Sequence, residues 1–154
     1  MSAVGERPTT DASGRGAAFH SPPAGEVLRV VEPTMFERYI LTSPSLWYDD
    51  RVMLARERAY AAVHTDMRAD VFLSIGSFET VNTSSSNTRY HRQNDMVRDL
   101  RKFEAQLRSR RYPGLHIESK VIDDEDHLTV YPAAITRGLM WALPAQRSLS
   151  AQMR

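Results

Sequence analysis

Apolar and polar positions follow one another along this chain in a pattern that predicts buried strands. Residues 39–42 and 71–75 are short apolar runs that end at Ser43-Pro44 and at Gly76, as buried strands do. In residues 115–121, apolar side chains alternate with polar ones, which is typical of a half-buried strand near the edge of a sheet. The pattern therefore predicts three strands.

The segments between and after these strands show the apolar spacing of helices. Residues 50–64 are predicted to form an amphipathic helix. A clearer helix begins near residue 96, with Asn94 as its expected N-cap and Pro113-Gly114 as its stop. The apolar stripe of this helix consists of Met96, Leu100, Phe103 and Leu107. Pro132 opens the last predicted helix.

Strands that alternate with helices in this way predict an α/β fold, in which three parallel strands are joined by right-handed crossover helices. Ligands of such folds bind beyond the carboxyl ends of the strands. The loops in which we expect functional residues are therefore 43–50, 76–94 and 123–130.

The first residues of the chain do not share this pattern. Residues 1–26 are rich in Gly, Pro, Ser, Thr and Ala, and they bury too little apolar surface to offset the entropy of ordering them. We therefore expect a disordered lead over residues 1–31, one ordered domain over residues 32–147 and a tail over residues 148–154.

Composition narrows the possible partners and chemistry. No apolar run approaches the roughly 18 residues that a membrane span needs, and a net charge of +1 provides no overall field for nucleic acid, so neither partner is expected. The absence of cysteine excludes a thiol nucleophile and thiolate metal sites. No apolar stretch near the start is typical of a signal peptide, so a cytoplasmic location is expected unless such a peptide precedes this start.

Two residues in the expected functional loops have the chemistry of an acid–base pair. His127 follows the third predicted strand, where an exposed imidazole could act as a general base, and Glu79 follows the second, where its carboxylate could orient that imidazole. The alternatives are an acidic surface turn that happens to contain a histidine, and an ordinary loop glutamate. A metal site made by His127 and the acidic residues around it is a third possibility, but consecutive loop residues rarely all point inward, so no metal or other cofactor is predicted.

Two further segments have both a functional and an ordinary interpretation. The loop that contains Ser45 and Trp47 could line a substrate pocket, or Trp47 could simply fill the gap between loop and helix. The arginines of the second helix could contact nucleic acid, but Asp99 and Glu104 interrupt them, and such residues normally cover a solvated helix face.

Three segments together are similar to a known family. TMFERYILTSPSLWYDD, VFLSIGSFE and YPGLHIESKVIDDEDHLTVYPAAITRGLMWAL, in this order and spacing, resemble the C-terminal half of the α/β-hydrolase esterases that include enterochelin and other siderophore esterases and the esterase D group. The resemblance covers residues 32–144 and implies a partial α/β-hydrolase fold. It also implies a serine hydrolase of small-molecule carboxylic esters, with His127 as base, Glu79 as its acid and a nucleophile upstream of both.

The chain departs from this family where the nucleophile belongs. The family carries a Gly-x-Ser-x-Gly elbow before the first of these segments. Here Ser21 is the candidate nucleophile, but Phe19 and Pro23 occupy the glycine positions. We therefore expect impaired ester hydrolysis. The alternative is an inactive, truncated or frame-shifted remnant that at most binds a partner or self-associates through an open sheet edge.

Overall fold

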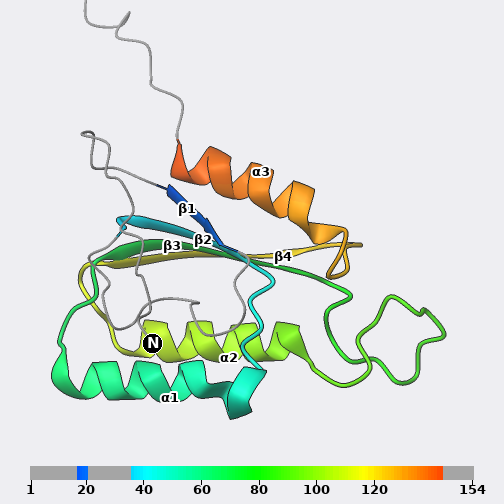
Figure 1. Ribbon diagram of the computed structural model, residues 1–154, viewed down its shortest axis with the longest axis horizontal. Coiled ribbons are helices and arrows are strands. Elements are labelled where there is room, and N and C mark those ends of the chain that lie inside the picture. Colours follow the sequence, from blue (N-terminus) through cyan, green and yellow to red (C-terminus); the bar gives the residue numbers. More distant parts are fainter. Residues whose placement is uncertain (1–16, 21–35, 144–154) are drawn as a thin grey trace, which may run out of the picture.

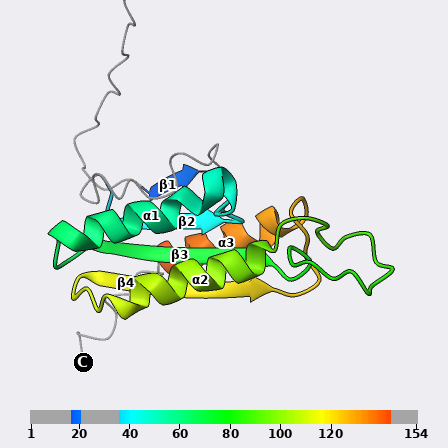
Figure 2. The same cartoon turned by 90° about the horizontal axis from the view of Figure 1, so that it is seen from below.

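The computed structural model describes residues 17–20 and 36–143 of the chain. These residues form a four-stranded parallel sheet in the order β1-β2-β3-β4, with three helices around it (Figure 1). The strands are β1 (Ala17–His20), β2 (Arg38–Thr42), β3 (Ala69–Gly76) and β4 (Leu115–Ile122). The helices are α1 (Tyr48–Val63), α2 (Met96–Ser109) and α3 (Val130–Ala142). Helices α1 and α2 cover one face of the sheet, whereas α3 covers the other (Figures 1 and 2).

The three predicted strands are present and parallel, and β4 lies at an edge as expected. The structure adds β1, which pairs with β2 through the register Ala17↔Arg38 to His20↔Leu41. Residues 17–20 belong to the segment expected to be a disordered lead, but here their backbone pairs with β2, a partner that a local sequence pattern does not reveal. The rest of the lead and the tail lie outside the described residues.

The helix ends differ slightly from those predicted. Asp95, and not Asn94, caps α2, because its side chain accepts a hydrogen bond from the backbone N–H of Arg98. Helix α3 begins at Val130, two residues before the proline expected to open it. Residues Asp49, Asp50 and Arg51 of α1 have positive φ, so regular right-handed helix follows only after them.

The core has two layers, one on each face of the sheet. Toward α1 and α2, Val71, Leu73 and Ile75 of β3 are fully buried, and Phe103 of α2 packs in the same apolar cluster. Toward α3 the layer is thinner, and a Cβ at Gly138 would lie 2.6 Å from a methyl group of Ile40. A glycine therefore lets α3 approach the sheet closely.

Among the residues that the structure describes, none of the helices has the length and apolar character that crossing a membrane requires.

Register places the carboxyl ends of the strands at one edge of the sheet. Thr42 is aligned with Ser74, and Gly76 is aligned with Ile122. The loops that follow β2, β3 and β4 therefore emerge side by side, at the edge where parallel α/β folds bind their ligands.

Candidate active site

Glu79 is the buried centre of this edge. It lies just after β3 and its side chain is fully buried. Its Oε1 accepts hydrogen bonds from the Ser43 hydroxyl at 2.6 Å and from the Gly76 backbone N–H at 2.8 Å. Its Oε2 lies 2.8 Å from Nδ1 of His127. Buried carboxylates are costly unless hydrogen-bonded, and here each carboxylate oxygen has a partner.

The contact with Glu79 determines which nitrogen of His127 is available for chemistry. A carboxylate only accepts hydrogen bonds, so Nδ1 carries the proton and Nε2 of the neutral ring can take up another. The His127 side chain is 40% exposed, whereas that of Glu79 is 0% exposed. A buried acid therefore orients a histidine that still reaches solvent, which is the arrangement of a general base and its orienting carboxylate.

Local backbone geometry brings the two loops together. The backbone N–H of Phe78 donates to the carbonyl of Glu125 at 2.9 Å, and a Cβ at Gly76 would lie only 2.4 Å from that carbonyl oxygen. Position 76 therefore has to be glycine for the loop after β4 to lie this close. Two aromatic rings flank the imidazole of His127, those of His91 and Tyr131, each with its centroid 6.1 Å away.

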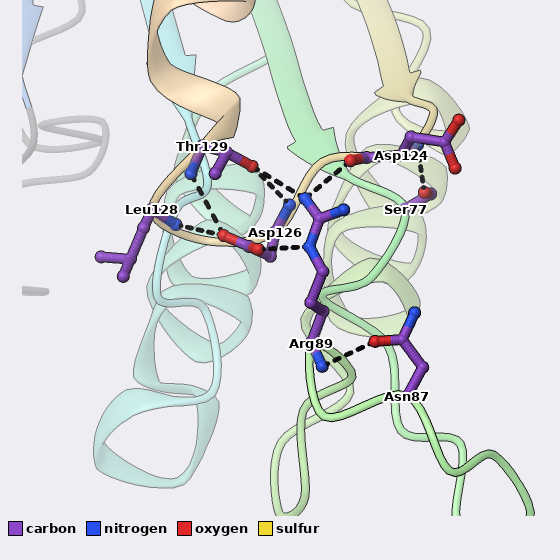
Figure 3. Close-up of polar contacts among 7 residues, drawn as sticks. All are labelled: Ser77, Asn87, Arg89, Asp124, Asp126, Leu128 and Thr129. Carbon is purple, nitrogen blue, oxygen red and sulfur yellow. Dashed lines mark hydrogen bonds and ion pairs between the residues drawn. The ribbon is translucent and has the colours of Figure 1, made fainter.

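The long loop after β3 contributes an arginine to the loop of His127 (Figure 3). Arg89 Nε donates to Asp126 Oδ2 at 2.7 Å, and its Nη2 donates to the Asp124 carbonyl at 2.7 Å and to Thr129 Oγ1 at 3.1 Å. The hydrogen bond from Arg89, together with those from the backbone N–H groups of Leu128 and Thr129, lowers the pKa of Asp126 to about 2.

The structure thus brings together two of the predicted site residues, Glu79 and His127, whose catalytic roles stay predictions. Ser21 lies outside the described residues. Ser45 is half-buried and Trp47 is 37% exposed, and in the described part of the chain no hydrogen bond joins either side chain to Glu79 or His127. Their role in substrate binding also stays a prediction.

Two participants were missed from the sequence, Ser43 and Arg89. Ser43 ends the apolar run of β2 and has a left-handed backbone, with φ of 47°. A serine at the carboxyl end of a buried strand was a usable signal. Arg89 lies in a polar loop and had no such signal. Within residues 17–20 and 36–143, no group of three or more His, Asp or Glu side chains is arranged to hold a metal ion.

Comparison with known proteins supports the fold. No family model matches the chain, and no curated protein matches it. Several solved structures are similar in fold. Three of them are the siderophore hydrolase EstB from Aspergillus nidulans (TM-score 0.56, 22% identity, 75% of this chain and 43% of that one), the siderophore hydrolase EstA from the same organism (0.54, 25%, 73% and 42%), and the BES protein from Bacillus cereus (0.53, 20%, 71% and 38%).

The chain spans less than half the length of each of these three proteins. The likeness covers 75%, 73% and 71% of this chain, and together with the parallel sheet it confirms the predicted partial α/β fold.

Proposed function

We propose that this chain carries the acid–base half of a serine esterase that hydrolyses carboxylic esters. The observation that supports this most directly is the buried Glu79 carboxylate, which accepts a hydrogen bond from the partly exposed imidazole of His127 at the carboxyl edge of a parallel sheet. Two proteins of similar fold are siderophore hydrolases by name, and the order of acid before histidine along the chain agrees with the α/β-hydrolase arrangement.

In the proposed reaction, His127 Nε2 takes the proton of the nucleophilic hydroxyl as its oxygen attacks the ester carbonyl. The proton then passes from Nε2 to the departing alcohol, which leaves an acyl-enzyme. A water molecule loses a proton to the same nitrogen and attacks the acyl group. Nε2 then returns this proton to the nucleophilic oxygen as the bond to the acyl group breaks and the carboxylic acid is released. Glu79 remains a carboxylate throughout, because its task is to hold the ring and to stabilise the imidazolium.

Ser21 is the candidate nucleophile. It is the next residue in the sequence after β1, which ends at His20, and β1 is parallel to β2, with His20 in register with Leu41. The chain contains no Gly-x-Ser-x-Gly sequence. Because that elbow exposes the hydroxyl and supplies an oxyanion-hole N–H, we propose that turnover is impaired, by about 100-fold or more for a lost oxyanion donor alone.

The second candidate function is an inactive remnant, and one observation favours it. The sequence contains no Gly-x-Ser-x-Gly elbow to expose a nucleophilic hydroxyl. In this case the Glu79–His127 pair has no catalytic role, and the chain at most binds a partner or self-associates.

A serine-directed fluorophosphonate probe, followed by hydrolysis of p-nitrophenyl acetate, separates the two candidates. For an esterase we expect labelling at Ser21, loss of labelling in Ser21→Ala, and a fall in turnover of about 100-fold or more in His127→Ala. The matched control is His116→Ala, since His116 is an exposed histidine at the opposite end of β4, bonded to Asp70. If the unaltered chain showed no labelling and no turnover, the esterase proposal would fail and the inactive remnant would be the remaining candidate.

A further inference from the structure

Arg89 joins the loop after β3 to the loop that holds His127, and its hydrogen bonds reach residues on both sides of the histidine in the sequence. The other hydrogen bonds between these loops in the described part of the chain, apart from the Glu79–His127 contact itself, reach Ile122, Asp124 and Glu125, which all precede His127. Arg89 reaches Asp124 and Asp126, which precede His127, and it also reaches Thr129, two residues after the histidine (Figure 3).

Asp126, which Arg89 binds, is itself hydrogen-bonded to the residues that follow His127. Its Oδ1 accepts hydrogen bonds from the backbone N–H of Leu128 at 2.9 Å and of Thr129 at 3.1 Å, and its own N–H donates to Thr129 Oγ1 at 3.1 Å. These bonds close a turn around His127, and Arg89 holds the other oxygen of the same carboxylate. The backbone that carries the imidazole is therefore fixed from both sides.

With the same guanidinium group, Arg89 also packs against the residue next to Glu79. Its guanidinium lies 4.5 Å from the centre of the Phe78 ring, and Phe78 directly precedes Glu79 in the chain. The Phe78 ring in turn packs edge-on against Tyr90, with ring centroids 5.0 Å apart. One side chain thus spans the neighbour of the buried acid and the neighbour of the histidine.

We propose that Arg89 is a positioning residue that holds the imidazole of His127 in register with the carboxylate of Glu79, through its ion pair with Asp126 and its stacking on Phe78. Its catalytic consequence rests on the proposed esterase function, but its effect on the imidazole does not. Arginine suits this role because its planar group donates to several acceptors at once and stacks on an aromatic face, neither of which lysine reproduces fully.

The direct test is proton NMR of the His127 Nδ1–H, whose hydrogen bond to Glu79 protects it from exchange and shifts it downfield. If the downfield signal is lost in the Glu79→Gln variant, it can be assigned to the His127 Nδ1–H. We expect Arg89→Gln to broaden or remove this signal, and Arg89→Lys to weaken it less, while the amide spectrum of β3 and α2 stays unchanged. The matched control is Arg92→Gln, because Arg92 is exposed on the same loop and makes no hydrogen bond or ion pair to the residues described.

Asp126→Asn provides a second variant in case Arg89→Gln does not fold. It keeps an oxygen that can accept from Leu128 and Thr129 but removes the charge that Arg89 pairs with. The same loss of the Nδ1–H signal would support the proposal. An unchanged signal in a folded Arg89→Gln or Asp126→Asn would overturn it.

Ester hydrolysis gives the kinetic readout. We expect Arg89→Gln to lower kcat for p-nitrophenyl acetate by about 10- to 100-fold with KM nearly unchanged, because a displaced base slows proton transfer more than substrate binding. A fall in KM and kcat that Arg92→Gln reproduces would contradict a positioning role. If the unaltered chain has no activity, the proposed function fails, whereas the NMR experiment still decides whether Arg89 positions the imidazole.

Discussion

At the scale of single residues, Gly76 sets how closely the loops after β3 and β4 approach each other. Its backbone N–H donates to Glu79, while the space where a Cβ would lie is occupied by the carbonyl of Glu125. The same glycine therefore contributes a donor to the buried acid and leaves room for the loop of the histidine. Any side chain at this position has to displace one loop from the other.

Gly76→Ala is accordingly expected to destabilise the fold by about 1 to 3 kcal/mol, since the contact of 2.4 Å is with backbone that cannot rotate away. Urea unfolding followed by circular dichroism measures this. Gly114→Ala is the matched control, because its Cβ would meet only side-chain atoms, Arg68 Cγ at 2.8 Å and the Asp66 carboxylate oxygens at 3.0 and 3.1 Å, which can move more easily than backbone. We expect the control to cost less than about 1 kcal/mol. Equal losses in the two variants would contradict this account.

Glu79 and His127 could be found from the sequence because both follow predicted strands at the edge where ligands bind. Ser43 also follows a predicted strand, which was a usable signal, whereas Arg89 lies in a polar loop and had none. Their partners Glu79 and Asp126 lie 36 and 37 residues away along the chain, so the sequence does not reveal the two contacts. What selects them is the approach of two loops in space, which depends on strand order and register.

At the scale of elements, a fully buried glutamate joins the two helices on one face of the sheet. Glu57 of α1 accepts hydrogen bonds from Arg110 Nε at 2.9 Å and Nη2 at 3.0 Å, and Gln106 of α2 donates to it as well. The pair also raises the pKa of Arg110, because its hydrogen bond to Glu57 favours the charged guanidinium. A buried charge in this position depends on its partners.

Arg110→Ala should therefore lower the free energy of unfolding by clearly more than the loss of an exposed arginine does, since it leaves the buried Glu57 without its cation. Chemical denaturation monitored by tryptophan fluorescence gives the value. Arg101→Ala removes an exposed arginine from the same helix and should change stability by no more than about 0.5 kcal/mol. A small loss for Arg110→Ala would mean that solvent satisfies Glu57 instead.

The helices themselves were predictable, because Leu100, Phe103 and Leu107 repeat at helical spacing and all are buried. The spacing does not choose between adjacent polar residues as caps, so Asn94 was predicted where Asp95 forms the hydrogen bond. The strand β1 was missed for a different reason. Four residues of ordinary composition become a strand only when β2 provides the hydrogen-bonding partner.

At the scale of the whole molecule, β1 and β4 form the two edges of the sheet. The edge strand β4 carries exposed charged side chains, and Lys120 pairs with Glu118 at 2.8 Å along it. Charges on an edge strand discourage pairing with other chains. We propose that self-association of this chain, where it occurs, uses the opposite edge, at which β1 covers four positions of β2.

Removing residues 1–20 would uncover the edge of β2. We expect the shortened chain to form more dimers and larger species, as measured by light scattering on a sizing column over a tenfold range of concentration. Lys120→Ser/Glu118→Ser in the full chain, which removes charge from β4 only, should shift the distribution less. If the shortened chain remained as monomeric as the full one, β1 would not protect this edge.

The order β1-β2-β3-β4 means that every strand pairs with the one made just before it. A chain emerging from the ribosome can therefore add strands one at a time, each onto an existing partner, without waiting for a distant segment. Helix α3 is the exception, since the Arg38 guanidinium bonds to the carbonyl of Ala142, 104 residues later. The sheet face beneath α3 is thus covered last. During synthesis it is the surface that stays accessible to chaperones and proteases for the longest time.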